Sequence, residues 1–369
     1  MSEKEKGLSV LSNLKIALFH LGSGMVDVLT LGMWNRIMIS DLGIAATPVS
    51  LLVSLRYFLA PLGIWAGRVS DKRDILGFRR LFWVWLGRLL MVLSTFGLGY
   101  ATSEFARNPA DASVMIWSII VASMVLFSFG NAISGSTFLA LIYDRATEKQ
   151  RGRAVGIVWT FLLLGFTIGG ILFSILLPKQ ETVDTGLTFL PSDLLRLFLI
   201  AGGIFFSLWF FSLLGEEKRH SDNLRRDAGE SPTSLRGDLA LVWRSLPMRF
   251  FLFYLTLSMF FAFSQDPVLE PFAGDVFGMA ASVTNRFAAY WGSMSIFASL
   301  FALWLLRKGE RFTHQRLSQT GIVILIVTFV LFTVGAVLQI EASIIPGLLL
   351  LGLGLGFWNI GTLGLMMDM

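Results

Sequence analysis

Apolar residues along this chain gather into ten long runs that are separated by short polar segments. A helix needs about 20 consecutive apolar residues to cross a hydrocarbon core of about 30 Å. Each of the ten runs meets that length, so the pattern predicts an all-α polytopic membrane protein. The predicted spans are 15–39, 48–67, 80–100, 114–143, 153–177, 193–214, 249–270, 286–306, 318–338 and 343–364.

Composition supports this class of protein. Hydrophobic residues make up 54% of the chain and charged residues only 15%, and the mean hydropathy is +0.70. A soluble protein of 369 residues would carry more surface charge than this. The chain has no cysteine, which excludes disulfides and cysteine-based metal or redox sites.

Basic residues crowd into every second gap between the spans. With the N-terminus in the cytoplasm, 23 of the 30 Lys and Arg residues face the cytoplasm, four face the opposite side and three lie within spans. The positive-inside rule therefore predicts a cytoplasmic N-terminus. The excess of basic residues, which gives a pI of 9.6, would then face anionic lipid headgroups. No nucleic acid partner is expected.

The spacing of the spans predicts two bundles. These are an N-terminal six-helix bundle over 1–214, a mixed-charge cytoplasmic linker over 215–245, and a C-terminal bundle of four spans over 246–369. Six spans, a linker and further spans are typical of transporters built from two six-helix halves. Four spans do not complete a second half, so we expect ten visible spans of twelve, with the last two helices missing from this chain.

Two basic loops carry a recognisable pattern, with Gly67, Asp71, Lys72, Arg79 and Arg80 in the first and Asp144, Arg145 and Arg151 in the second. These residues resemble the cytoplasmic loops of the major facilitator superfamily. We expect Gly67 to permit close helix approach and Asp71 to accept hydrogen bonds from an Arg or a helix N-terminus, so that the loops form a cytoplasmic latch. The first match has three extra residues before Gly77. The alternative is a set of merely basic loops.

Charged residues inside spans need a partner or a function. Asp27 and Arg56 share a depth of roughly 16 to 18 Å at about 1.5 Å per residue, which predicts an ion pair, with Arg88 as the next candidate partner. Such a pair could be structural, or it could bind substrate or protons.

A second group of polar residues is expected near the outer ends of spans one and seven. It comprises Asn35, Arg36, Asp266 and Glu270. Arg36 and Glu270 are expected at equal height, so we expect an outer gate or ligand site, with Asp266 as the alternate acceptor and two prolines loosening the backbone. The alternative is that span seven ends at Ser264 and that the following residues form a surface loop.

His20 is the one histidine within a predicted span. It could ligate the magnesium of a porphyrin-like pigment, or it could lie harmlessly near the interface. The 33 Phe and 11 Trp residues include many that would face lipid, although an aromatic-rich interior would also suit a large flat hydrophobic ligand.

Several segments together resemble the PucC/LhaA family, also called the bacteriochlorophyll delivery family, whose members have the major facilitator fold. The most specific segments are residues 35–39 (NRIMI) and 266–272 (DPVLEPF), supported by the first loop and the terminal GLMMDM. The resemblance implies assembly of light-harvesting complexes in a photosynthetic membrane, either the bacterial cytoplasmic and intracytoplasmic membrane or a thylakoid. It also implies light-harvesting or photosystem polypeptides as partners and (bacterio)chlorophyll as a partner or bound cofactor.

Three functional hypotheses follow from these features. The first is a membrane assembly factor, and not an enzyme, that delivers or handles (bacterio)chlorophyll and antenna polypeptides. The second is a proton-coupled secondary transporter of a small solute. The third is an enzyme of pigment metabolism, against which stands the lack of a P-loop, zinc motif, dinucleotide fingerprint or catalytic triad in a credible context.

Overall fold

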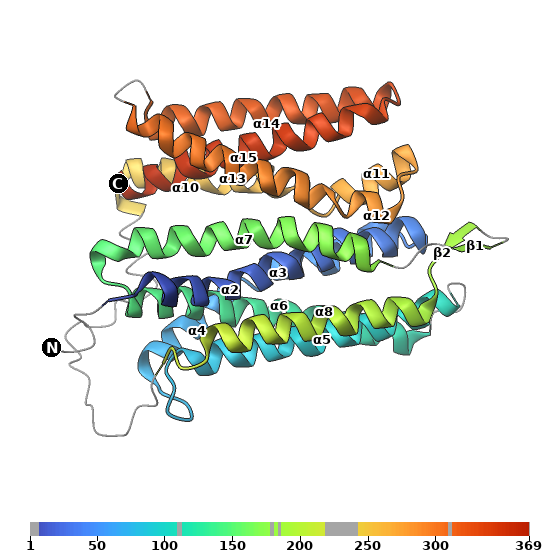
Figure 1. Ribbon diagram of the computed structural model, residues 1–369, viewed down its shortest axis with the longest axis horizontal. Helices are drawn as coiled ribbons and strands as arrows, with labels where there is room; N and C mark the ends of the chain where they lie inside the picture. Colours follow the sequence, from blue (N-terminus) through green and yellow to red (C-terminus); the bar gives the residue numbers. More distant parts are fainter. Residues whose placement is uncertain are drawn as a thin grey trace. The chain divides into compact units, whose positions relative to one another are not determined.

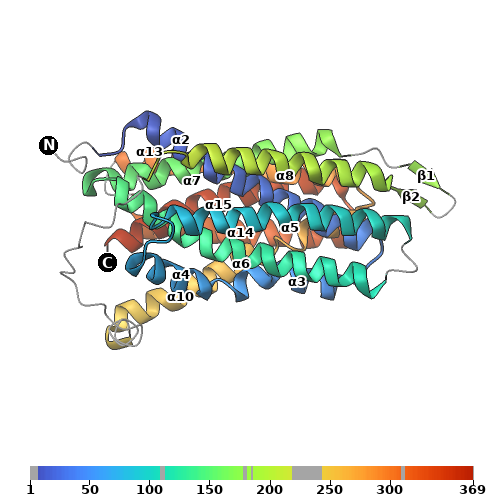
Figure 2. The same ribbon diagram turned by 90° about the horizontal axis from the view of Figure 1, so that it is seen from below.

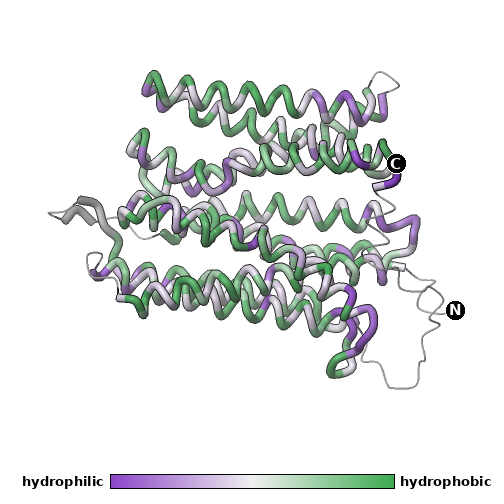
Figure 3. Tube along the Cα trace, turned by 180° about the vertical axis from the view of Figure 1, so that it is seen from behind, coloured by the Kyte–Doolittle hydropathy of each residue, from purple (hydrophilic) through white to green (hydrophobic). Residues whose placement is uncertain are grey.

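The computed structural model describes residues 7–108, 113–177, 181–183, 186–217, 243–308 and 312–368. Within these ranges, ten helices are long and apolar enough to cross a membrane. The prediction of an all-α polytopic membrane protein is therefore confirmed. Hydrophobic residues cover most of each helix, whereas hydrophilic residues gather near helix ends and in loops (Figure 3).

The helices follow the predicted spans in order. The first six spans correspond to α2 (Val10–Asp27) with the π-helical segments η1 (Val28–Trp34) and η2 (Ile37–Asp41), α3 (Ala46–Phe58) with α4 (Pro61–Lys72), α5 (Leu81–Arg107), α6 (Val114–Arg145), α7 (Glu148–Leu176) and α8 (Pro191–Leu213). The others correspond to α10 (Leu246–Phe263), α12 (Ala281–Thr284) with α13 (Phe287–Arg307), α14 (His314–Val337), and α15 (Ile344–Asp368) after the 3-10 turn η4 (Glu341–Ser343). The short helix α11 (Leu269–Phe277) lies between α10 and α12, and strands β1 (Glu181–Val183) and β2 (Gly186–Thr188) form an antiparallel hairpin between α7 and α8.

Three predicted spans are interrupted. Span one, which we call helix one (residues 10–41), winds as a π-helix after Asp27. Span two breaks just before Pro61, because proline supplies no N–H and its ring clashes with the preceding turn. Span seven stops at Phe263, and residues 264–268 form turns before α11 begins. The predicted span over 249–270 is thus a broken helix and not a continuous one.

Packing divides the chain into two compact units. Unit 1 comprises Met1–Arg219 and Pro267–Gly292, and unit 2 comprises His220–Asp266 and Ser293–Met369. The division follows packing and not chain order, so the predicted C-terminal bundle over 246–369 shares its residues between both units. Most of the predicted linker, residues 218–242, lies outside the described residues.

Glycines set the closest helix crossings in unit 1. A Cβ added to Gly165 of α7 would lie 2.3 Å from the carbonyl oxygen of Leu21 in helix one, and Gly87 of α5 meets the backbone of Gly130 in α6 just as closely. Helix α5 also packs along α8 (Figures 1 and 2). Small residues bring backbones together in this way because lipid supplies no hydrophobic force between helices.

Unit 2 is held mainly by the crossing of α14 and α15. A Cβ added to Gly361 would lie 2.4 Å from the backbone nitrogen of Ser318, as expected for the Gly-rich row of the last predicted span. Near this crossing, the hydroxyl of Tyr254 in α10 contacts Ser318 and also lies 3.0 Å from the hydroxyl of Thr362. A hydroxyl from each of three helices therefore meets in an otherwise apolar interior.

Candidate functional site

Residues 35–39 and 267–272, which carry the most specific family resemblance, lie against each other within unit 1. Asn35 lies between the two π-helical segments of helix one, and its Nδ2 donates to the carbonyl oxygen of Pro267 at 2.6 Å. Ser40 Oγ donates to the carbonyl oxygen of Pro271 at 3.4 Å. The end of helix one therefore holds α11 and the turn before it through side-chain bonds to their backbone. π-helical turns occur frequently at functional sites.

Arg36 is buried at this contact, with 5% of the residue exposed. Its guanidinium forms an ion pair with Asp41 at 3.1 Å and donates to the carbonyl oxygen of Met279 at 2.9 Å. It also lies directly on the backbone of Gly274, because a Cβ added there would be 2.5 Å from its Cζ. A side chain at this position would therefore displace the guanidinium.

Glu270 of α11 contacts helix one in the same way as Arg36 of helix one contacts α11. Its carboxylate lies over Gly32 of helix one, where an added Cβ would be 3.2 Å from Oε1. Each helix thus supplies a glycine on which a charged side chain of the other helix rests. We call Gly32, Asn35 and Arg36 of helix one, together with Glu270 and Gly274 of α11, the α11 clasp.

The clasp differs from the predicted gate in its charge pairing. Arg36 forms an ion pair with Asp41, on the same helix. Asp266 belongs to unit 2, where it accepts a hydrogen bond from Gln265 at 2.9 Å. Arg36 and Glu270 would lie at equal height on two straight α-helices. The π-helical segment of helix one and the break before α11 change which side chains meet.

A second contact holds the segment that follows α11. Ser174 of α7 donates to the carbonyl oxygen of Ser282 in α12 at 2.6 Å, and Arg286 donates to Ser174 Oγ at 2.9 Å. Asn285 Nδ2 donates to the carbonyl oxygen of Gly170 at 3.4 Å. The sequence analysis did not find Ser174, although its spacing of one turn from Gly170 marks a small-residue row on α7.

The structure brings together Asp27 and Arg56. The Arg56 Nη1 and Asp27 Oδ1 atoms lie 2.6 Å apart, and 9% and 24% of the two side chains are exposed. Arg88, the other candidate, lies over the rings of Phe19 and Trp209, with its Cζ 4.2 Å and 4.8 Å from their centroids. Among the described residues no carboxylate lies within 4.0 Å of the Arg88 guanidinium, so cation–π contacts take the place of an ion pair.

His20 is enclosed by aromatic rings. Its ring centroid lies 5.6 Å from that of Phe19, 4.9 Å from Phe138 and 5.9 Å from Trp159. Its Nδ1 is buried without a hydrogen-bond partner among the described residues. The imidazole therefore packs among rings on helix one, α6 and α7.

The predicted latch residues gather at the basic end of unit 1, defined by Lys15, Arg79, Arg80 and Arg145. Asp71 accepts from Arg79 at 2.9 Å and from Arg80 at 2.5 Å, and Arg80 also pairs with Asp144 at 3.0 Å. The two predicted motifs therefore meet through Arg80. Lys72 is exposed, and the exposed Arg151 lies over the ring of Tyr143, 5.4 Å from its centroid.

Gly67 does not have the expected role. A Cβ added there would meet nothing within 4 Å, whereas one added to Gly63 would lie 2.7 Å from the carbonyl oxygen of Ala132. The close approach of α4 to α6 is therefore one helical turn earlier. The Gly67 carbonyl instead accepts from Ser70 Oγ at 2.7 Å.

Two carboxylates after α8 were missed by the sequence analysis. Glu216 pairs with Lys15 at 2.9 Å and with Arg145 at 3.4 Å. Glu217 accepts from the backbone nitrogens of Arg79 and Leu81, both at 2.7 Å, and so caps the N-terminus of α5. The sequence signal was a pair of acids placed directly after an apolar span, next to otherwise basic loops.

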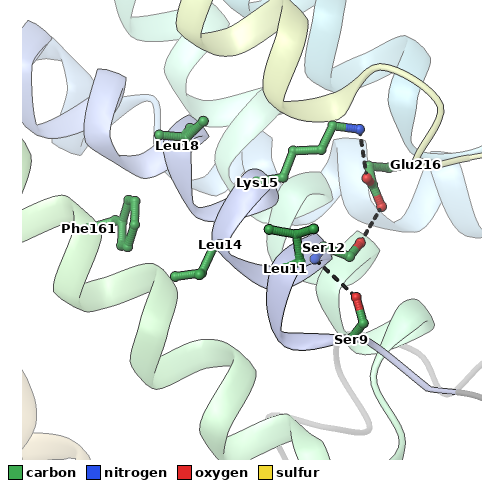
Figure 4. A pocket seen from close by; sticks show the side chains of 8 residues that line it. All are labelled: Ser9, Leu11, Ser12, Leu14, Lys15, Leu18, Phe161 and Glu216. Atoms are coloured by element: carbon green, nitrogen blue, oxygen red, sulfur yellow. Dashed lines mark hydrogen bonds and ion pairs between the residues drawn. The ribbon is translucent and has the colours of Figure 1, made fainter.

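An open groove lies beside this cluster (Figure 4). Its volume is about 660 Å³, and it is lined by Ser9, Leu11, Ser12, Leu14, Lys15, Leu18, Phe161 and Glu216. The Lys15–Glu216 pair forms its polar side, whereas leucines of helix one and Phe161 of α7 form its apolar side (Figure 4).

Comparisons with known proteins identify the chain's relatives. A family model described as "PUCC protein" matches residues 33–369. "Protein PucC" of Rhodovulum sulfidophilum is 26% identical over 357 residues, which cover 95% of this chain and 76% of that protein. "Bacteriochlorophyll synthase 44.5 kDa chain" of Rhodobacter capsulatus is 27% identical, over 96% of this chain and 78% of that protein.

Solved structures show the fold. A bacterial homologue of the human lysosomal transporter Spinster, in an inward-facing conformation, matches with a TM-score of 0.63 and 16% identity, covering 95% of this chain and 74% of that one. At this identity the likeness concerns the fold alone. The predicted major facilitator fold is therefore confirmed.

Proposed function

Since this chain belongs to the PucC family, we propose that it handles (bacterio)chlorophyll during the assembly of light-harvesting complexes. It would deliver the pigment to antenna or photosystem polypeptides, or hold it beside them, without acting as an enzyme. A relative whose name contains "bacteriochlorophyll synthase" supports the link to this pigment, and transporters with the same fold support movement of a cargo rather than chemical conversion.

The clasp is the observation that carries this proposal. The two segments with the most specific resemblance to this family contribute Asn35, Arg36 and Glu270 to it. General packing would not require buried polar side chains at this place, because burying them is costly. The clasp is therefore the part of the fold whose chemistry we assign to the family's own function.

Three residues could ligate the pigment's magnesium: His20, Asn35 and Glu270. Asn35 is the best candidate. Its Oδ1 is buried and has no hydrogen-bond partner among the described residues, a state that a ligand would relieve. Magnesium prefers oxygen ligands. His20 would offer a nitrogen from a ring packed against Phe138 and Trp159, and the Glu270 carboxylate already lies against Gly32. Because Asn35 is fully buried, a macrocycle would reach it only with the clasp open.

Deletion of the gene in a photosynthetic host tests this function. We expect assembled antenna complexes to fall while pigment synthesis continues, and we expect the native chain, but not Asn35→Ala, to restore them. Gly203→Ala is the matched control, because a Cβ at Gly203 meets nothing within 4 Å. Normal antenna levels in the deletion strain would remove the proposal.

We also propose a cytoplasmic N-terminus in a photosynthetic membrane, supported by the distribution of Lys and Arg. Ser231 of the predicted linker lies outside the described residues, but it offers a label site in a chain without cysteine. Ser231→Cys should resist a membrane-impermeant maleimide added to intact cells and react after lysis. Efficient labelling of intact cells would reverse the orientation.

A proton-coupled transporter remains the second candidate, favoured by the Asp27–Arg56 pair within a predicted span. Carboxylates within membrane spans mark ion and proton pathways in many transporters. Proteoliposomes containing a pH-sensitive dye would be screened with sugars, amino acids and nucleosides. A solute-driven proton flux that Asp27→Asn abolishes would favour this function over pigment handling.

A further inference from the structure

Helix one changes its winding between two polar contacts. It is α-helical as far as Asp27 and π-helical over 28–34 and 37–41. In the last turn the Leu42 nitrogen donates to the carbonyl oxygen of Ile37 at 2.9 Å, five residues back. A π turn therefore contains an additional residue compared with an α turn. Extended π winding is rare, so surrounding contacts must stabilise it.

The clasp supplies these contacts. Gly32, Asn35 and Arg36 all lie within the π-wound stretch or at its junction, and the Arg36–Asp41 ion pair lies along it. At the opposite end, Asp27 immediately precedes the first π residue and pairs with Arg56 of α3. The stretch 28–41 is thus held in its middle by the clasp, and the Asp27–Arg56 ion pair lies at its start.

We infer that the clasp and the Asp27–Arg56 ion pair form one coupled switch, connected through the π-helical stretch. When α11 separates from helix one, so that Glu270 leaves Gly32 and Arg36 leaves Gly274, residues 28–41 can rewind toward the α-helix. Each residue by which the helical register shifts rotates Asp27 by about 100° relative to the clasp residues. This rotation moves the Asp27 carboxylate away from Arg56. Coupling is reciprocal, so loss of the ion pair also weakens the clasp.

This inference goes beyond the proposed function, because it holds for any cargo. It differs from a simpler account in which the clasp and the ion pair are separate structural contacts. Separate contacts predict additive effects of substitution, since distant sites without shared partners usually add. A coupled switch predicts that breaking one contact reduces the effect of breaking the other.

A double-mutant cycle on the full chain separates the two accounts. Gly274→Ala opens the clasp, because its Cβ would lie 2.5 Å from Cζ of Arg36, and Asp27→Asn breaks the ion pair. We expect Asp27→Asn to lower the Tm in the native background and to lower it by about half as much or less in the Gly274→Ala background. Gly203→Ala should leave the Asp27→Asn loss unchanged. Equal losses in the native and Gly274→Ala backgrounds would overturn the inference.

Hydrogen–deuterium exchange supplies an independent measurement, which also serves if Gly274→Ala fails to fold. Asn35→Ala removes one clasp hydrogen bond and leaves both glycines in place. We expect Asn35→Ala and Asp27→Asn each to accelerate exchange throughout residues 28–41, with no change in Gly203→Ala. Faster exchange limited to the neighbourhood of each substituted residue would contradict the coupling.

Discussion

At the basic end of unit 1, the buried Arg80 pairs with Asp71 and Asp144, whose side chains are 50% and 41% exposed, whereas at the clasp Arg36 pairs with Asp41, whose side chain is only 7% exposed. The basic end is also redundant, because Arg80 contacts both carboxylates and Ser70. At the clasp, by contrast, Arg36 contacts one carboxylate, Asp41, and each of two glycines lies under a charged side chain of the other helix.

This difference predicts which substitutions should lower the stability of the protein most. Exposed ion pairs contribute little because water screens the charges and long side chains lose entropy. A buried pair behaves differently, since removal of one partner leaves an uncompensated charge. We therefore expect the clasp to be fragile and the basic end to be tolerant, although both contain arginine–aspartate pairs.

The largest effect should follow Arg36→Met. This change removes the Asp41 ion pair and the bond to the Met279 carbonyl, and we expect a loss of about 3–5 kcal/mol in unfolding free energy. Thermal unfolding in detergent measures it. Arg36→Lys, which keeps the charge but loses the planar guanidinium, should lose less. A silent Arg36→Met would show that the clasp does not stabilise unit 1.

Single substitutions of the Asp27–Arg56 pair come next. Asp27→Asn should cost about 2–4 kcal/mol, below the range for a fully buried pair because part of Asp27 is exposed. The double variant Asp27→Asn/Arg56→Gln should be more stable than Asp27→Asn alone, because no unpaired charge remains. The same thermal unfolding measures both, and the pair has no stabilising role if neither single variant changes the Tm.

Glu217→Ala should have an intermediate effect. The carboxylate caps the N-terminus of α5 through the backbone nitrogens of Arg79, Arg80 and Leu81, so its loss should cost about 1–2 kcal/mol. Glu217→Gln keeps one acceptor oxygen and is the matched control. Exchange of the first α5 amides should accelerate in the alanine variant, and unchanged protection would reject the cap.

Asp71→Asn should have the smallest effect, below about 1 kcal/mol, because Arg80 keeps Asp144 and Ser70. The double variant Asp71→Asn/Asp144→Asn should cost more than the two single changes combined, since the buried guanidinium then loses both carboxylates. Additive costs would mean that the basic end is not redundant.

The arrangement of the spans could be predicted because it depends on the length of apolar runs, which membrane thickness fixes. The π winding after Asp27 could not, because it depends on contacts with α11 from a distant part of the chain. The break at Phe263 was partly visible, since Pro267 and Pro271 mark the region where the backbone loosens.

The candidate site was predictable to a similar extent. Shared depth was enough to predict the Asp27–Arg56 pair, because both residues lie well inside spans. Depth alone could not identify Asp41 as the partner of Arg36, since their meeting depends on how the helix end winds. Nor could it find Glu217, whose role depends on where the chain goes after α8.

We propose above all that this protein handles pigment at a site that the clasp closes. The most direct test is the absorption spectrum of the full chain purified from a photosynthetic membrane, next to Asn35→Ala and Gly203→Ala purified in the same way. We predict a (bacterio)chlorophyll band in the native protein and in Gly203→Ala, and a reduced or shifted band in Asn35→Ala. A native protein without the band, or three identical spectra, would contradict the claim.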